Sequence, residues 1–255
     1  VMGQEKEDTH ISVYVSNLGK YNEGRLQGGW IDLPVPQAEL DRFLVETVGI
    51  DGQRYEEYAI HDFDYEGGLA AIGYKPDAYT SLNDLNVLAG ALQGLDAAKL
   101  EAVRLCGEEA LGTYPLPLEY ANLALQADEI PYYSYEFAGI EHADHWSNEE
   151  KLGWTLLEGS PLKELLEAHN ALDYFDVERY GAEEAQDFAL TDNGYLDRCA
   201  DFPDPSFYDR EELQELVADQ MGQEDYFFPA KEEQAVSLAG ECRDAMGARA
   251  ELGQD

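Results

Sequence analysis

The sequence predicts an α+β protein made of small subdomains, because the spacing of its apolar residues changes along the 255-residue chain. Strand-like alternation dominates the first part, helical spacing dominates the middle, and the two are mixed in the third part. We therefore expect a chain with a β-sheet plus helix, a helical middle, a mixed α/β C-terminal part and a helical C-terminal extension. The expected boundaries are 10–76, 77–128, 129–198 and 199–255.

The first unit combines three strands with one helix. Apolar residues alternate in "ISVYVSN" (11–17), as on one face of a strand. Two further strands are expected, one that ends near "WIDLP" (30–34) and one over "YEEYAIHDFDY" (55–65). Apolar residues in 36–49 recur at helical spacing up to a stop at Gly49.

The middle unit is expected to consist of three helices. Ser81 and Asp84 form a capping-box pattern in front of the first helix. Asp96 is expected to cap the second, and the third covers "PLEYANLALQADE" (117–129). The short connections imply antiparallel neighbours.

The C-terminal part mixes both periods. "PYYSYEFAGI" (131–140) alternates aromatic residues as a strand does, whereas Ser147 and Ser160 each precede a helical pattern. "DNG" (192–194) has the chemistry of a turn. After a proline-broken linker, the extension is expected to contain two helices, 209–221 and 231–248.

Charge is the unusual property of this chain. Its 54 Asp and Glu residues outnumber 16 Lys and Arg residues, which gives a net charge of −38. The 46 residues between Arg104 and Lys151 contain ten acids and no basic side chain, whereas ordinary surfaces intersperse the two signs. Adaptation to high salt and general solubility are two explanations, and a cationic partner is the third. Nucleic acid is excluded as a direct ligand, because binding phosphates requires clustered Lys and Arg.

We expect the acids of the base-poor stretches to form the surface that binds this partner. Asp62, Asp64 and Glu66 stand at alternate positions, so on a strand they would form a one-sided row with steps of about 6.6 Å. At the charge density of duplex DNA, 38 net charges correspond to roughly 65 Å of duplex. The expected binding residues are Glu56, Glu57, Asp62, Asp64, Glu66, Glu108, Glu109, Glu119, Asp128, Glu129, Glu136, Glu149 and Glu150.

Metal sites are poorly supported by the sequence. A calcium loop that opens at Asp62 would need a bidentate Glu at its twelfth position, where this chain has Gly73. His142 and His145 have a spacing that zinc ligands use, but two surface histidines among acids explain them as well. We therefore expect no metal and no cofactor.

Catalytic motifs do not stand out either. The chain has no GxSxG, no phosphate-binding P-loop and no dinucleotide-binding glycine pattern. Cys106 and Cys199 stand beside acids, which would raise rather than lower the pKa of a thiol. The three cysteines are widely spaced, which fits a reducing cytoplasm, and no apolar run is long enough for a membrane span. An acid-rich hydrolase or metal protein stays open as an alternative class.

Two segments closely resemble a known family, the ArdA antirestriction proteins. "VYVSNLGKYNEGRLQGGWIDLP" (13–34) with "YEEYAIHDFD" (55–64) resembles the amino-terminal signature. "LDYFDVERYGAEEAQDF" (172–188), which follows "LLEAHNA", is similar to the carboxy-terminal antirestriction motif, and "YEFAGIEHAD" and "SNEEKLGWTLLE" are similar too. The resemblance covers about residues 10–198.

The resemblance implies a DNA mimic, encoded on conjugative plasmids or transposons, that inhibits type I restriction-modification enzymes. Members are elongated three-part proteins that dimerise through the C-terminal region and imitate bent B-form DNA. They occupy the DNA groove of the methyltransferase/specificity core, and neither catalysis nor a cofactor is implied. The other function class is a binding module for a different basic protein, such as a nucleoid protein or a transcription factor.

The antirestriction motif, carried over by position, contains Tyr174, Phe175, Asp176, Glu178 and Tyr180. We expect Phe175 and Val177 to make core or dimer contacts, while structure and direct binding stay open for Asp176 and Glu178. The positions that match the amino-terminal signature suit a turn as well as recognition: Asn17, Gly19, Lys20, Tyr21, Asn22, Glu23 and Gly24. Residues 199–255 have no counterpart in the family, and three roles stay open for them: more decoy, a second partner or an altered dimer.

Overall fold

The computed structural model describes residues 9–137, 140 and 142–229, and the fold is α+β as predicted. The helices are α1 (Leu18–Asn22), α2 (Gln37–Phe43), α3 (Gly67–Ile72), α4 (Leu82–Leu92), α5 (Ala97–Ala110), α6 (Pro117–Leu125), α7 (Asn148–Leu157), α8 (Pro161–Ala168), α9 (Val177–Glu184) and α10 (Arg210–Gln220). The strands are β1 (Ile11–Asn17), β2 (Gly28–Leu33), β3 (Tyr58–Phe63), β4 (Tyr132–Ser134), β5 (Phe188–Leu190) and β6 (Gly194–Asp197).

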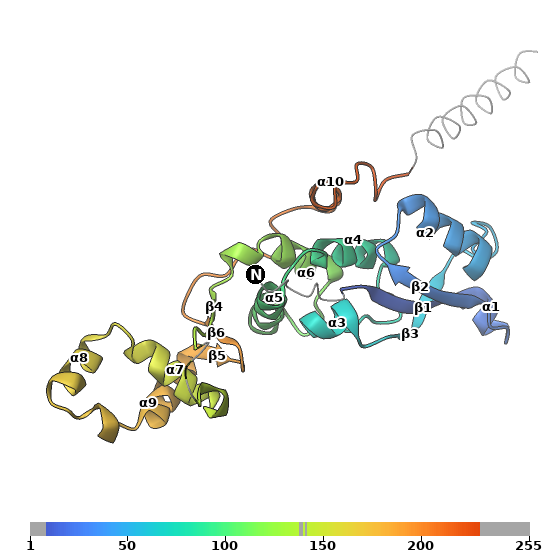
Figure 1. Ribbon diagram of the computed structural model, residues 1–255. Coiled ribbons are helices and arrows are strands. Elements are labelled where there is room, and N and C mark those ends of the chain that lie inside the picture. The colour runs from blue at the N-terminus through green and yellow to red at the C-terminus, as the bar shows by residue number, and fades with distance from the viewer. Residues whose placement is uncertain (1–8, 138–139, 141, 230–255) are drawn as a thin grey trace, which may run out of the picture.

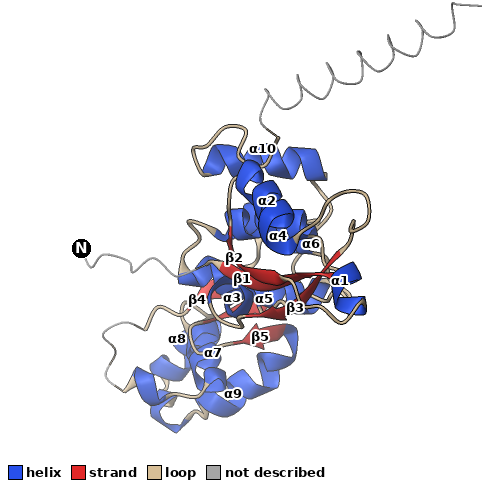
Figure 2. Cartoon of the chain, turned by 90° about the vertical axis from the view of Figure 1, so that its right-hand side faces the viewer, coloured by secondary structure: helices blue, strands red, loops and turns tan. Residues whose placement is uncertain are grey.

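The body is extended, and its parts follow one another along its length. Figure 1 shows the sheet of β1–β3 at one end, helices α4–α6 in the middle, and α7–α9 at the opposite end, with the small sheet of β4–β6 before them. In the turned view of Figure 2, α10 lies above the first sheet, and α7 and α9 appear below it. The exact subdomain boundaries stay a prediction.

The first sheet has the order β2-β1-β3, and both pairs are antiparallel. Alternate residues of β1, beginning with Ile11, are fully buried, which confirms the predicted strand. Helix α2 continues as a π-helical turn over Leu44–Val48 and ends at Gly49, whose φ of 78° suits glycine. The predicted third strand is shorter than expected, because pairing with β1 begins only at Tyr58.

Helix α3 was not predicted. It is a short helix that begins with two glycines, so it lacks the length and capping signals that sequence patterns need. The second glycine, Gly68, lies where a Cβ would approach Ile11 and the Thr9 backbone. Glycine here therefore lets α3 lie close to the start of β1.

The predicted caps of the middle helices are confirmed. The Ser81 hydroxyl accepts a hydrogen bond from the Asp84 N–H at 3.3 Å, and the Asp96 carboxylate accepts one from the Lys99 N–H at 2.9 Å. The Asp84 side chain pairs with Arg210 at 2.9 Å instead of completing the predicted capping box. Buried side chains of the first sheet, α4–α6 and α10 belong to one apolar cluster.

The second sheet, with the order β4-β6-β5, is small. Among the described residues of 131–140, the expected strand is formed at Tyr132–Ser134, whereas the expected turn at 192–194 joins β5 to β6. Ser147 and Ser160 cap α7 and α8 as predicted, and each hydroxyl accepts a backbone hydrogen bond.

Helices α7 and α9 cross at two glycines, Gly153 and Gly181. A Cβ at Gly181 would lie 2.7 Å from the Gly153 nitrogen, so both backbones come closer than any side chain would allow. Leu152, Leu157 and Val177 are buried in these two helices, outside the large cluster. The C-terminal part therefore has a small core of its own.

Residues 198–229 double back over the middle of the molecule. Helix α10 packs on α4 and α6. The Asn122 side chain of α6 accepts a hydrogen bond from the Tyr208 N–H at 2.8 Å and donates one to the Tyr208 carbonyl at 3.1 Å. Further along, the Tyr226 hydroxyl donates to the Pro34 carbonyl at 3.1 Å and the Gln37 N–H donates to the Tyr226 carbonyl. The first helix predicted in the extension is confirmed, and the second (231–248) lies outside the described residues. In the described part of the chain, no helix has both the length and the apolar character for crossing a membrane.

Candidate acidic binding surface

The outer face of the first sheet carries carboxylates in two cross-strand rows. In one row Trp30, Tyr14 and Asp62 lie opposite one another on β2, β1 and β3. In the other row Asp32 lies opposite Ser12 of β1, and the Asp64 N–H donates to the Ser12 carbonyl at 3.0 Å. Residues directly opposite on neighbouring strands share a face, so these acids point away from the buried side of β1.

The predicted one-sided row is therefore right for two of its three acids. Asp62 and Asp64 share the outer face, but Glu66 does not continue the row. Strand β3 ends at Phe63, and Glu66 lies directly before α3 at its N-cap position. The chain has to turn from the sheet into α3, which ends the two-residue alternation on which the row depended.

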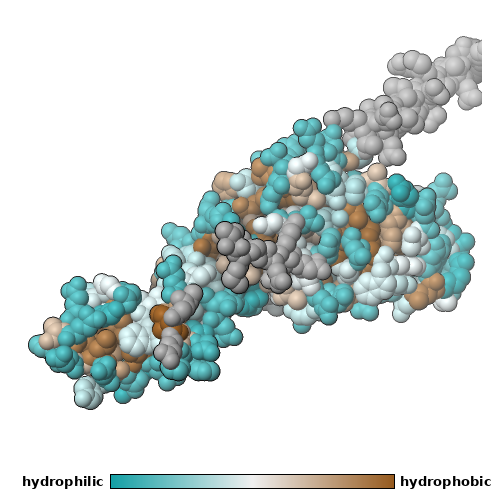
Figure 3. All heavy atoms as spheres, in the orientation of Figure 1, coloured by the Kyte–Doolittle hydropathy of each residue, from teal (hydrophilic) through white to brown (hydrophobic). Residues whose placement is uncertain are grey.

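The other predicted acids are distributed along the body and are not gathered at one place. Exposed members of the set are Glu56, Glu57, Asp62, Asp64, Glu66, Glu108, Glu109, Asp128, Glu129 and Glu136. Half-buried members are Glu119, Glu149 and Glu150. In Figure 3, hydrophilic residues cover most of the visible face from one end to the other, with apolar patches between them.

Some of the predicted acids have local partners. Glu108 pairs with Arg104 at 2.8 Å, Glu109 with Arg198 at 2.7 Å and Asp128 with Lys99 at 2.7 Å. Glu119 accepts the Leu116 N–H at 2.6 Å and so caps α6. These four acids already interact with groups of the same chain, so they are less available to a partner than the acids without such interactions.

Most of the described Lys and Arg side chains also form ion pairs with neighbouring acids. Among the described residues, the Lys and Arg side chains in ion pairs are Arg25, Arg54, Lys99, Arg104, Lys163, Arg179, Arg198 and Arg210. No described Lys or Arg lies within ion-pair distance of Asp32, Asp62 or Asp64. The negative charge of the outer sheet face is therefore not offset locally.

The amino-terminal signature builds a polar cluster at the end of the first sheet. Asn17 caps α1, and Glu23 binds Arg25, Arg54 and the Tyr55 hydroxyl. Hydrogen bonds from both guanidinium groups and from Tyr55 lower the pKa of Glu23 to about 2. Asn17 and Glu23 of the signature thus shape this turn.

The antirestriction motif surrounds the start of α9. Asp176 accepts the Arg179 N–H at 3.0 Å as the N-cap, and Glu178 accepts a hydrogen bond from the Ser147 hydroxyl at 2.8 Å. Phe175 is half-buried and contacts the Tyr180 ring at 5.7 Å, whereas Tyr174 is 89% exposed. Asp176 and Glu178 are therefore exposed and also hold the helix in place, and Tyr174 is the motif residue most available to a partner.

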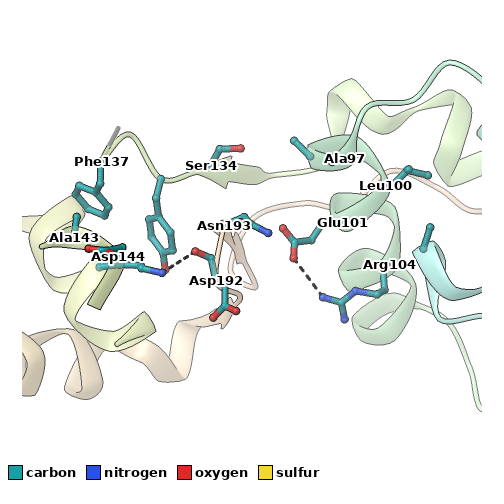
Figure 4. A pocket seen from close by; sticks show the side chains of 14 residues that line it. Ala97, Leu100, Glu101, Arg104, Ser134, Phe137, Ala143, Asp144, Asp192 and Asn193 are labelled. Carbon is teal, nitrogen blue, oxygen red and sulfur yellow. Dashed lines mark hydrogen bonds and ion pairs between the residues drawn. The ribbon is translucent and has the colours of Figure 1, made fainter. Parts of the chain in front are cut away.

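A cleft of about 680 Å³ separates α5 from the loops of the second sheet (Figure 4). Arg104 lies 3.8 Å from Glu101, the Lys151 ammonium donates to the Asp192 carbonyl at 2.9 Å, and the side chains of Asp144 and Asp192 also line the cleft. Glu101 also accepts the Tyr132 hydroxyl at 2.5 Å. The cleft is therefore lined by charged side chains of both signs.

Neither the cysteines nor the histidines form a chemical site in the described residues. Burial raises the pKa of the Cys106 thiol to about 11, so burial and not the neighbouring acids dominates there. At the exposed Cys199 the charge of Asp187 raises the thiol pKa, as predicted. No group of three or more His, Cys, Asp or Glu residues in the described ranges could hold a metal ion.

Trp30 and Asp32 were missed as binding candidates. They stand in the predicted second strand, and only the pairing of β1 with β2 and β3 brings them to the same face as Asp62 and Asp64. The alternation of Trp30 and Asp32 with buried Ile31 and Leu33 was the signal available in the sequence.

Comparison with known families agrees with this architecture. The model of the antirestriction protein (ArdA) family matches residues 13–197, from within β1 to the end of β6. A comparison with curated proteins finds no match. The family match spans well over half of the 255 residues and includes both signature segments. The chain therefore belongs to the ArdA family of antirestriction proteins.

Proposed function

We propose that the chain inhibits type I restriction-modification enzymes as a DNA mimic. It occupies the DNA groove of the methyltransferase/specificity core, without catalysis or a cofactor, in the cytoplasm of a cell that carries a conjugative plasmid or transposon. The observation that carries this proposal is the combination of family membership with carboxylates along an extended body in which most of the described Lys and Arg side chains are in ion pairs.

Charge density supports the mechanism. Duplex DNA carries one charge per ~1.7 Å of axis, and the net charge of −38 belongs to a body with acids on its first sheet, middle helices and C-terminal part. A DNA-binding groove releases counterions from DNA when its Lys and Arg bind, and a folded row of carboxylates competes for the same groups. Acids fixed on strands and helices lose little conformational freedom on docking.

We further propose that the active form is a homodimer joined through the C-terminal part. An apolar groove in this part is lined by aromatic residues, including Trp146 and Trp154. Tyr133 and Ile140, at the same groove, are about half exposed. Exposed apolar residues around one groove favour an interface.

A cleavage assay tests the proposal. Purified type I enzyme is incubated with a DNA substrate and increasing amounts of the chain, and a type II restriction enzyme serves as the control. The proposal predicts loss of type I cleavage with type II cleavage unchanged. Unchanged type I cleavage at a molar excess contradicts it, and retention of a different basic DNA-binding protein from lysate would favour the second function class.

A further inference from the structure

The outer face of the first sheet contains a groove that the predicted acidic surface does not explain. This sheet-face groove has a volume of about 440 Å³ and is lined by Ser12, Trp30, Asp32, Phe63 and Asp64. Asp32 and Asp64 lie on either side of Ser12, across the width of the three-stranded sheet. Neighbouring strands are ~4.8 Å apart, so the backbones that carry the two acids are about 10 Å apart.

An exposed tryptophan lines the same groove. Trp30 is 51% exposed, and its ring forms a T-shaped pair with the Tyr14 ring, with the ring centroids 5.7 Å apart. Trp30 stands two residues from Asp32 on β2, and a large aromatic ring left half exposed to water loses the stabilisation that burial would give. Its position suggests that a ligand covers it.

The carboxylates of the groove are oriented but not neutralised. The Ser12 hydroxyl donates to Asp32, which fixes that carboxylate on the sheet. Described Lys and Arg side chains do not pair with Asp32 or Asp64. An anion would be repelled here, and an apolar ligand would desolvate both charges without replacing their hydrogen bonds.

We propose that the sheet-face groove receives an arginine side chain of the partner protein. A guanidinium is planar, stacks on an indole ring and donates to carboxylates on its edges, whereas a lysine ammonium is a compact point charge. Asp32 and Asp64 bind its edges and Trp30 covers one face. The inference rests on the proposed function, because arginines that grip DNA phosphates are the side chains a decoy meets.

Short peptides test the groove itself. Hexa-arginine and hexa-lysine are titrated into the full chain by calorimetry, with wild type, Trp30→Leu, Trp30→Phe, Asp32→Asn/Asp64→Asn and the charge-matched control Glu56→Gln/Glu57→Gln. We expect wild type to prefer hexa-arginine, Trp30→Leu to weaken that peptide about three- to tenfold, and Trp30→Phe to restore part of it. The groove double variant should weaken hexa-arginine at least threefold more than the control does.

Circular dichroism of each variant checks that the fold is retained. Equal affinity of both peptides for wild type, or equal losses in the groove and control variants, would overturn the inference. The cleavage assay separates it from the proposed function. If wild type inhibits and the groove variants inhibit as well as the control, the inference about arginine binding is wrong, and the proposed DNA mimicry is retained. If the peptides bind as expected but wild type does not inhibit, the proposed DNA mimicry is wrong, and arginine binding in the groove is retained.

Discussion

Replacement of Gly181 by alanine tests how the antirestriction motif is held in place. Helix propensity alone favours alanine over glycine in a helix by about 1 kcal/mol. The added Cβ, however, would lie 2.7 Å from the Gly153 nitrogen and 2.8 Å from the Glu149 carbonyl carbon, and closer still to the Glu149 oxygen. These neighbours are backbone atoms, so α7 and α9 must separate.

We expect the free-energy cost of separating α7 and α9 to exceed the gain in helix propensity. Overpacking costs about 1–3 kcal/mol, and backbone neighbours favour the upper value because they cannot rotate away. After the gain of about 1 kcal/mol from propensity is subtracted, Gly181→Ala should lower the free energy of unfolding by about 2 kcal/mol. The loss falls on the small core that contains Leu152 and Val177.

Urea unfolding followed by tryptophan fluorescence measures this change. Two of the three tryptophans, Trp146 and Trp154, lie in the C-terminal part with their ring centroids 5.8 Å apart, so their contribution to the signal reports on the affected core. Gly112→Ala is the control, because a Cβ there meets nothing within 4 Å. A Gly181→Ala protein as stable as wild type would refute the argument that the close approach of α7 and α9 requires glycine at this position.

Three further predictions concern the extension, the net charge and a thiol. Val217→Asp, at a fully buried position of α10, should lower the free energy of unfolding by about 3 kcal/mol or more in denaturant titrations. The control Leu216→Asp, at a 41% exposed position, should change it by about 0.5 kcal/mol or less. Because a net charge of −38 repels itself, the midpoint of thermal unfolding near neutral pH should rise as sodium chloride is added; a midpoint that falls or stays constant would contradict this. Asp187→Asn should lower the pKa of Cys199 and so speed its alkylation by iodoacetamide at pH 8, measured by peptide mass spectrometry, and an unchanged rate would show that Asp187 does not control the thiol.

Local signals predicted much of the fold. Ser81, Asp96, Ser147 and Ser160 each cap the helix that follows, because a cap depends on a side chain and a backbone N–H only three residues away. Strand β1 was predicted for the same kind of reason, since its alternation lies within seven residues.

Long-range contacts could not be predicted in this way. Arg198 neutralises Glu109 and Arg210 binds Asp84, and each pair is far apart in sequence and meets only through the return of the chain over the middle helices. The sheet-face groove has the same cause, because Trp30 and Asp32 of β2 come to the same face as Asp64 only through strand pairing. Composition predicted an acidic surface, but tertiary structure decides which acids stay unpaired.

A competition titration tests the central claim most directly. Labelled DNA is titrated with the methyltransferase/specificity core of a type I enzyme at several fixed concentrations of the chain and at several salt concentrations. Our account predicts that the apparent Kd for DNA rises linearly with the concentration of the free chain and that the inhibition weakens steeply as salt increases. An unchanged Kd, or a ternary complex in which enzyme, DNA and the chain bind together, would contradict the account.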